Sequence, residues 1–231
     1  FFFKNTNKIK YLINNANHII TSAPGLLDKV GAISKKNNST YICASIETFR
    51  YVNTKIAKNT DQINIGWTGT FSSMEYLKII EPALIKINSI RNIKFIVISN
   101  IKYHHKDINH ESIIWTKDNE ISDLCKIDIG VYPLPMQDDW VLGKSGLKSL
   151  QYMALGIPSV SSNVGNIKNI ITNYRNGILV NNENEWCQSL IKLIDNKELR
   201  HTIGKNGQLK VKNEFSVEVL NKKYINIFNN L

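Results

Sequence analysis

The sequence predicts an α/β fold with a Rossmann-like, doubly wound parallel sheet. From about residue 60 onward, short apolar runs alternate with longer segments whose apolar residues recur at helical spacing. Strands that alternate with helices pair in parallel, because each crossover returns the chain to the same edge of the sheet. With 231 residues, 42% of them hydrophobic, the chain is long and apolar enough for a packed core.

The elements of this sheet can be located one by one. Apolar and polar residues alternate from Ile63 and then meet Gly69, which predicts a strand followed by a tight turn. Ser72 or Ser73 can cap a helix that ends near Asn88. We expect later strands at residues 93–98, 113–115, 127–132, 159–161 and 177–180. Later helices are expected at residues 120–126, 166–172, 183–195, 198–213 and 217–229.

The first 60 residues follow a different pattern. They contain two expected helices, at residues 8–17 and 26–35, two short strands, at 18–21 and 41–44, and a polar stretch at 57–61. Two strands are too few for an independent sheet, and the chain lacks an initiating Met, so we expect a piece of a larger protein. The expected regions are the remnant of a preceding domain plus a linker (1–60), the sheet domain (61–215), and a C-terminal helix packing back toward the first region (216–231).

Charge and cysteine usage exclude several classes of protein. The formal net charge is +10, but the lysines are scattered and no arginine-rich block exists, so we expect no nucleic-acid partner. The three cysteines are widely spaced without a C-x-x-C pair, which argues against a disulfide framework or a zinc site and favours a reducing compartment such as the cytoplasm. No apolar run of about 18 residues occurs that could span a membrane.

A glycine-rich, basic segment at residues 143–158 is the strongest candidate site. It reads as a helix that starts at Gly143, directly after a strand. The unpaired backbone N–H groups and the dipole of such a helix start favour a bound phosphate. Helical spacing places Lys144, Lys148 and Gln151 on one narrow face. The opposite, apolar face is expected to pack on the sheet with Leu147, Leu150, Met153 and Ala154.

Other sites have weaker support. The Gly-Lys-Ser at residues 143–145 is not a P-loop, because Asp138 stands where that motif requires glycine, and the glycines at 66 and 69 do not form a dinucleotide fingerprint. A histidine-rich stretch at residues 104–111 suits a solvated loop better than a metal site. Trp140 is either a stacking lid or an ordinary anchor, whereas Trp67 and Trp186 are expected in the core. No nucleophile-elbow serine suggests a catalytic triad.

Several motifs in combination resemble a known family. They are IGWTGTFSSMEYL, DIGVYPLP, GKSGLKSLQYMALGIPSVSSNVG and NGILV, and together they span most of the chain. This combination resembles the C-terminal, donor-binding half of family 4 (group 1) retaining glycosyltransferases of the GT-B fold. The earlier segment ANHIITSAPGLLDKV is similar to the last strand and helix of the acceptor-binding domain in that family.

The resemblance implies a nucleotide diphosphate sugar as donor substrate, with no cofactor and no metal. It implies that the diphosphate is bound by Gly69, Thr70, Lys144, Ser145, Gly146, Leu147 and Lys148, and that Gln151 holds the ribose. The base or the sugar is expected near Ser99, Asn100, Trp115, Pro135 and Trp140. No catalytic residue is assigned.

The sequence departs from the family pattern in three respects. Gly143 and Gln151 stand where the family commonly has two glutamates, and the basic pair that follows the first strand is missing before Lys78. Gln151 can still hydrogen-bond a ribose hydroxyl, and Lys144 and Lys148 can supply the missing positive charge.

The implied function is transfer of a sugar to an acceptor hydroxyl with retention, in polysaccharide, glycolipid or glycoconjugate synthesis. The acceptor is a glycan or a lipid-linked molecule, and a lipid acceptor would bring peripheral contact with the inner face of the membrane. Three alternatives remain: a catalytically inactive nucleotide-sugar-binding protein, a nucleotide-sugar epimerase on the same fold, and, from the net charge alone, a nucleic-acid-binding module.

Overall fold

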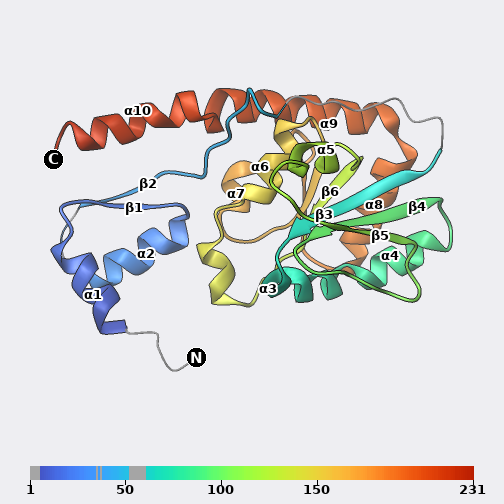
Figure 1. Ribbon diagram of the computed structural model, residues 1–231, viewed down its shortest axis with the longest axis horizontal. Coiled ribbons are helices and arrows are strands. Elements are labelled where there is room, and N and C mark those ends of the chain that lie inside the picture. The colour runs from blue at the N-terminus through green and yellow to red at the C-terminus, as the bar shows by residue number, and fades with distance from the viewer. Residues whose placement is uncertain (1–5, 35, 37, 52–60) are drawn as a thin grey trace.

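The computed structural model describes residues 6–34, 36, 38–51 and 61–231, and within them a six-stranded parallel sheet forms the centre of the larger, right-hand part of the molecule in Figure 1. The strand order is β5-β4-β3-β6-β7-β8. The order reverses between β3 and β6, which is where doubly wound sheets open a crevice at the carboxyl ends of their strands. The strands are β3 (Ile63–Gly69), β4 (Ile93–Ser99), β5 (His110–Ile114), β6 (Ile129–Tyr132), β7 (Ser159–Ser162) and β8 (Ile178–Val180).

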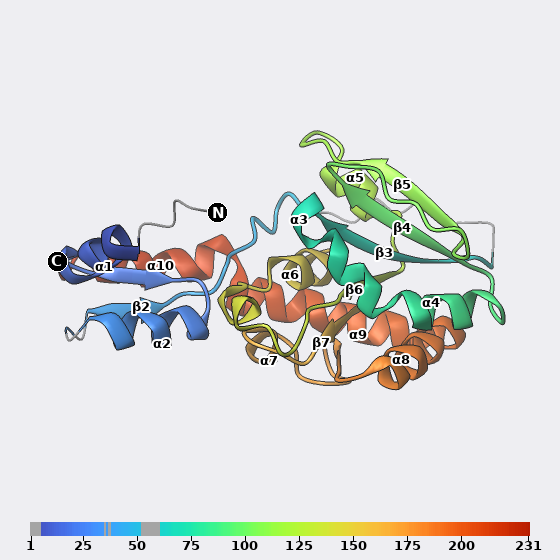
Figure 2. The ribbon, with the colours of Figure 1, turned by 90° about the horizontal axis from the view of Figure 1, so that it is seen from below.

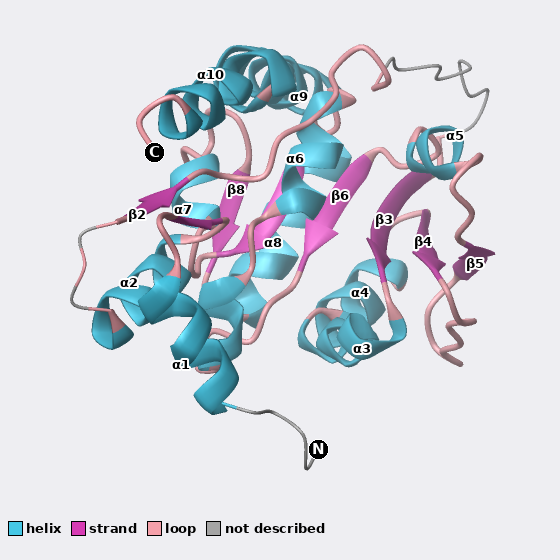
Figure 3. Cartoon of the chain, turned by 60° about the vertical axis from the view of Figure 1, so that its left-hand side comes forward, coloured by secondary structure: helices cyan, strands magenta, loops and turns pink. Residues whose placement is uncertain are grey.

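Helices cover both faces of this sheet. On one face, α4 (Glu81–Asn88) and α8 (Glu183–Asp195) pack around the fully buried Trp67 and Trp186, as predicted. On the other face, α5 (Glu120–Leu124) and α6 (Leu147–Ala154) enclose a second cluster (Figure 3). Further elements of this region are α7 (Ile167–Ile170), α9 (Lys197–Lys210), a π-helical turn (Val211–Phe215) and α10 (Val217–Phe228). No described helix is long and apolar enough to cross a membrane.

The single helix predicted from Ser72 or Ser73 to Asn88 is broken. Its place is taken by α3 (Phe71–Met74), a 3₁₀ helix (Glu75–Ile79) and α4. Pro82 lies in the first turn of α4, where its missing N–H costs nothing, but it could not donate within a continuous helix. The prediction failed because periodicity of apolar residues runs through this break unchanged.

The predicted helix start at Gly143 is also wrong. Residues Asp139–Gly143 form a 3₁₀ helix, and α6 begins only at Leu147, after Gly146 with φ of 87°. Lys144 therefore precedes the helix and shares no helical face with Lys148. Leu147, which was expected to pack on the sheet, is 42% exposed. Because Gly146 adopts a left-handed conformation, the residues before it do not continue the helical spacing of α6. The spacing of residue types along the sequence does not reveal this interruption.

The N-terminal region forms a separate small unit. It contains α1 (Thr6–Asn15), β1 (Ile19–Thr21), α2 (Pro24–Ile33) and β2 (Ser39–Tyr41), with β1 and β2 paired in parallel. Figures 1 and 2 show α10 running from the six-stranded region to this unit, where Tyr224 helps to line a groove together with α1 and α2. The predicted linker, apart from Asp61, lies outside the described residues, and the predicted domain boundaries stay predictions.

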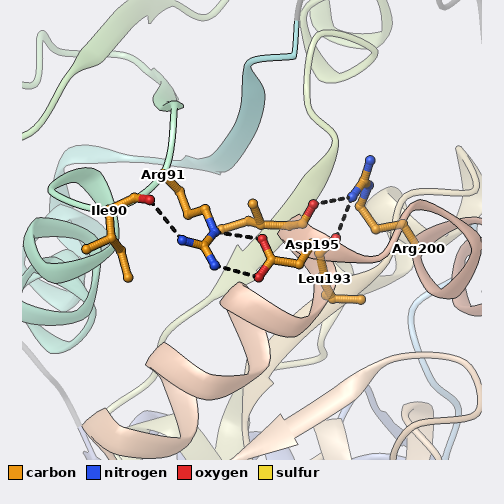
Figure 4. A network of polar contacts seen from close by, with 6 residues as sticks. Ile90, Arg91, Leu193, Asp195 and Arg200 are labelled. Atoms are coloured by element: carbon orange, nitrogen blue, oxygen red, sulfur yellow. Dashed lines mark hydrogen bonds and ion pairs between the residues drawn. The ribbon is translucent and has the colours of Figure 1, made fainter.

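A network of polar contacts surrounds the end of α8 at the amino end of the sheet (Figure 4). The Arg91 guanidinium donates to both carboxylate oxygens of Asp195, at 2.7 and 2.9 Å. Arg200 donates to the backbone carbonyls of Leu193 and Ile194 at the end of α8. Each cation here has an acceptor within the protein, and the network fixes the end of α8 against the loop before β4.

Candidate functional site

A cavity of about 360 Å³ lies at the carboxyl ends of β3 and β6, where the strand order reverses. It is lined by Thr68, Gly69, Thr70, Trp115, Glu120, Tyr132, Lys144, Ser145, Leu147, Lys148 and Gln151. Eight of these residues were predicted from the sequence: Gly69, Thr70, Trp115, Lys144, Ser145, Leu147, Lys148 and Gln151. The fold thus brings residues from the ends of β3, β5 and β6, and from the connections that follow them, to one place.

The other predicted site residues lie around this cavity or outside it. Ser99 is buried at the end of β4 beside Gly69, and the Asn100 side chain accepts a hydrogen bond from Phe71 N at the start of α3. Pro135 lines a different cavity near β8, and Trp140 is 59% exposed. Their proximity to a base or a sugar stays a prediction.

The cavity exists because the ends of β3 and β6 separate. The two strands pair only at Ile65–Ile129 and Gly66–Gly130. Beyond that point, the buried hydroxyl of Tyr152 accepts a hydrogen bond from Thr68 N at 3.0 Å and donates to Val131 O at 3.4 Å. Tyr152 thereby replaces the missing ladder bonds, and burial raises its pKa, so the bridging hydroxyl keeps its proton. Nothing in the sequence pattern distinguished this tyrosine from other core residues.

Two lysines give the cavity its positive charge. The Lys148 ammonium lies 5.1 Å from the ring centroid of Tyr132 and 5.8 Å from that of Trp67. Burial, and to a smaller extent the neighbouring charge of Lys144, lowers the pKa of Lys148 to about 8. Neither lysine forms an ion pair with a carboxylate in the part of the chain that the structure describes. A half-buried cation without a counter-charge is unfavourable, and a bound anion would relieve that cost.

The turn that contains Lys144 and leads into α6 is fixed by residues from other elements. The fully buried Asn166 donates from Nδ2 to Ser145 O at 2.6 Å, and Tyr41 donates to Asn166 Oδ1, also at 2.6 Å. A Cβ on Gly146 would overlap the Ile170 side chain, so glycine is needed both for its φ and for close packing. The turn is therefore fixed by contacts with the N-terminal unit and α7 rather than by the sequence of α6 alone.

Gly69 contributes to the cavity through its backbone. The family resemblance implies that Gly69 binds the diphosphate, which would be one reason for a glycine at this position. The structure gives a different reason, because a Cβ at this position would overlap the ring of Trp67. The glycine thus makes room for the core tryptophan on which Lys148 lies.

A polar cluster that sequence analysis missed lies beside Gln151. Gln151 is largely buried, and its Nε2 donates to Tyr51 Oη at 3.0 Å and to Glu120 Oε1 at 3.3 Å. Trp115 Nε1 donates to the same oxygen of Glu120 at 3.3 Å. Gln151 is thus surrounded by polar partners and faces the cavity, as a ligand-binding residue requires.

No metal centre is visible among the described residues. None of their His, Cys, Asp and Glu side chains form a group of three or more that could hold a metal ion. In the histidine-rich loop, the rings of His104 and His110 meet edge to face at 5.4 Å. Metal independence of the protein stays a prediction.

Comparison with known proteins supports the fold. The chain is 22% identical to the capsular polysaccharide biosynthesis glycosyltransferase CapM of Staphylococcus aureus over 199 residues, covering 79% of this chain and 51% of CapM. Sucrose-phosphate synthase from Thermosynechococcus elongatus superposes with a TM-score of 0.77 at 15% identity, over 96% of this chain and 60% of that one. The chain therefore spans about half the length of its curated relative CapM.

A second solved structure is Anabaena HepE in complex with UDP and glucose. It has a TM-score of 0.77 at 14% identity, and the superposition covers 100% of this chain and 68% of HepE. These neighbours share the Rossmann-like sheet domain of GT-B glycosyltransferases. The family model described as glycosyl transferases group 1 matches residues 54–210, more than half of the chain. The chain belongs to the group 1 glycosyltransferase family and has the Rossmann-like α/β fold predicted from its sequence.

Proposed function

We propose that this chain binds a nucleotide diphosphate sugar in the cavity between β3 and β6, and that the protein transfers the sugar to an acceptor hydroxyl. The observation that carries the proposal is the pair of lysines at the switch point of the sheet, Lys144 and Lys148, neither of which forms an ion pair with a described carboxylate. Membership of the group 1 family supports it, as does the presence of UDP and glucose in HepE. The similarity to CapM favours a role in polysaccharide synthesis.

The key step of the proposed reaction is departure of the nucleoside diphosphate. The bond between the anomeric carbon and the diphosphate oxygen breaks, a bond to the acceptor oxygen forms, and the proton of the acceptor hydroxyl passes to the leaving diphosphate. Negative charge grows on the leaving diphosphate as this happens. Lys144, Lys148 and the free N–H groups at the start of α6 would stabilise that charge more in the transition state than in the ground state.

Several finer features belong to the same proposal. The family resemblance implies retention at the anomeric carbon, membership of family 4 and independence from metal, and the cysteine pattern favours a cytoplasmic location. The acceptor, a glycan or a lipid-linked molecule, would bind to a part of the protein that is not contained in this chain. Closure of two domains over the donor would bring the acceptor to it.

An inactive nucleotide-sugar-binding protein is the second candidate. One observation favours it: Gly143 brings no side chain to the position where the family commonly has a glutamate. Turnover separates the two candidates. Slow hydrolysis of the donor by the intact protein, reduced in Gln151→Ala, supports the enzyme, whereas tight binding without transfer or hydrolysis supports the binding protein.

A thermal-shift panel with UDP, GDP, ADP and their sugars tests the shared part of the proposal. At about 100 times its dissociation constant, a ligand stabilises the folded chain by about 2.7 kcal/mol. We expect one nucleotide class to stabilise the parent and to stabilise Lys148→Ala much less. Lys205→Ala, which removes an exposed lysine on α9, is the control and should behave as the parent. If no nucleoside diphosphate stabilises the parent chain, the proposal is wrong.

A further inference from the structure

Among the described residues that line the cavity, Glu120 alone has a carboxylate. It is the first residue of α5, and its side chain reaches over to α6. Its Oε1 accepts two hydrogen bonds, from Gln151 Nε2 and Trp115 Nε1, each at 3.3 Å. Its Oε2 has no hydrogen-bond donor among the described residues. One oxygen thus fixes the carboxylate, while the other remains able to accept protons from a ligand.

The charges of the cavity are divided between two sides. Gln151 follows Lys148 by three positions on α6, so the Glu120–Gln151 pair lies about 5 Å farther along the helix than Lys148. A phosphate would be repelled by Glu120 and attracted by the lysines. Hydroxyl groups have the opposite preference, because an ionised carboxylate accepts their protons in strong hydrogen bonds. The cavity therefore suits a ligand whose phosphates lie about one helical turn from a pair of hydroxyls.

A ribonucleoside diphosphate has this arrangement, since its ribose hydroxyls lie close to the first phosphate. We propose that Glu120 binds the 2′- and 3′-hydroxyls of the donor's ribose, with Gln151 held in place beside it, and that Glu120 makes the site select ribonucleotides. This inference rests on the proposed function and adds a specificity-determining residue to it. Trp115 and Tyr51 act as positioning residues, since each bonds to Glu120 or Gln151.

The test compares two ligands that differ only in the hydroxyls. UDP and 2′,3′-dideoxy-UDP are titrated by calorimetry into the parent and into Glu120→Gln, which keeps the size of the side chain and removes its charge. We expect the parent to bind UDP at least about ten-fold more tightly than the dideoxy ligand, the size expected for charge-assisted hydrogen bonds. In Glu120→Gln, UDP should lose most of that advantage. The dideoxy ligand should bind the variant as tightly as the parent or slightly more tightly, because a repulsive charge is gone.

Two outcomes would overturn the inference. Equal losses for both ligands would mean that Glu120 only supports the shape of the cavity, and an unchanged UDP affinity would mean that it does not meet the ligand. Asp118→Asn removes an exposed charge two residues away and should leave both affinities unchanged. Thermal melting without ligand shows that each variant is folded.

Inorganic pyrophosphate separates this inference from the proposed function. It has no hydroxyl-bearing sugar, so it should bind the parent and Glu120→Gln with similar affinity. If UDP and pyrophosphate both bind, but UDP binds no more tightly than dideoxy-UDP, the proposed role of Glu120 is wrong. The proposed donor site would still be supported. If neither pyrophosphate nor any of UDP, GDP and ADP binds the parent, the donor site itself is wrong, and the inference falls with it.

Discussion

The positive charges at the two ends of the parallel sheet differ in whether they have a partner of opposite charge within the protein. At the amino end, Arg91 and Asp195 form a two-point ion pair, with both side chains about two-fifths exposed. At the carboxyl end, Lys148 is half-buried over two aromatic rings and has only another lysine, Lys144, as a charged neighbour that affects its pKa. The first arrangement is complete within the protein, whereas the second becomes favourable only when an anion arrives.

This difference separates charges that hold the fold from charges that serve a ligand. An exposed ion pair adds little stability, because water screens it, but it orients α8 against the loop before β4. A half-buried lysine without a partner of opposite charge lowers the stability of the folded chain. Binding of an anionic ligand offsets that loss. The following variants test the contrast, beginning with the largest expected effect.

Lys148→Ala should weaken binding of a nucleoside diphosphate the most. A charge-assisted contact to phosphate contributes about 1.5–3 kcal/mol, so we expect a loss of about ten-fold or more in affinity. Lys144→Ala should have an effect of the same sign. Calorimetric titration measures both, with Lys205→Ala as the matched control. If both cavity variants bind the nucleotide as tightly as the parent, the two lysines do not contact the ligand and are only solvated surface charges.

Gly146→Ala should lower both stability and binding. Its φ of 87° costs an alanine about 1–2 kcal/mol, and the added methyl group would also displace the Ile170 side chain. Chemical denaturation measures the first effect and nucleotide titration the second. Gly31→Ala is a suitable control, because a Cβ there meets no atom within 4 Å and α2 accepts alanine. A Gly146→Ala protein as stable as the parent would contradict the role of this turn.

The affinity for a nucleoside diphosphate should fall as the pH rises through about 8. Below that value Lys148 is charged in the free protein, and above it the lysine must take up a proton before it can pair with phosphate. We expect a loss of up to about ten-fold between about pH 7 and about pH 9, absent in Lys148→Ala. Calorimetry in buffers of different ionisation enthalpy would detect the proton uptake directly.

The same pKa shift predicts the sign of a stability effect in the free chain. The pKa of Lys148 falls from 10.5 to about 8 on folding, so the unfolded chain binds more protons between these values. Lys148 therefore destabilises the fold at neutral pH, and this cost disappears as the pH rises through that window. The difference in unfolding free energy between the parent and Lys148→Ala should shift in favour of the parent over the same range. A difference independent of pH would contradict the lowered pKa.

Arg91→Ala should have the smallest effect. The pair with Asp195 is exposed, so we expect its loss to lower the melting temperature by about 2 °C or less, and less still at high salt. Nucleotide affinity should not change, because the pair lies at the opposite end of the sheet. A large loss of nucleotide binding in this variant would show that the two ends are coupled.

Parts of the site could be predicted from the sequence because they depend on neighbours along the chain. Lys144, Lys148 and Gln151 were found through a glycine-rich basic segment after a strand, and all three line the cavity. Glu120 could not be found in this way, since it comes from another crossover and meets Gln151 only in space. Tyr51 likewise reaches Gln151 across 100 residues of sequence.

The sequence by itself determined the alternation of strands and helices, the two core tryptophans and the basic segment, because periodicity and composition are local properties of a chain. Only the tertiary structure decided where α6 begins, since Asn166 and Ile170 hold the turn around Gly146 from outside that segment. It also decided that β3 and β6 separate over Tyr152 and so open the cavity. Both decisions depend on contacts between distant residues, and a linear pattern does not contain them.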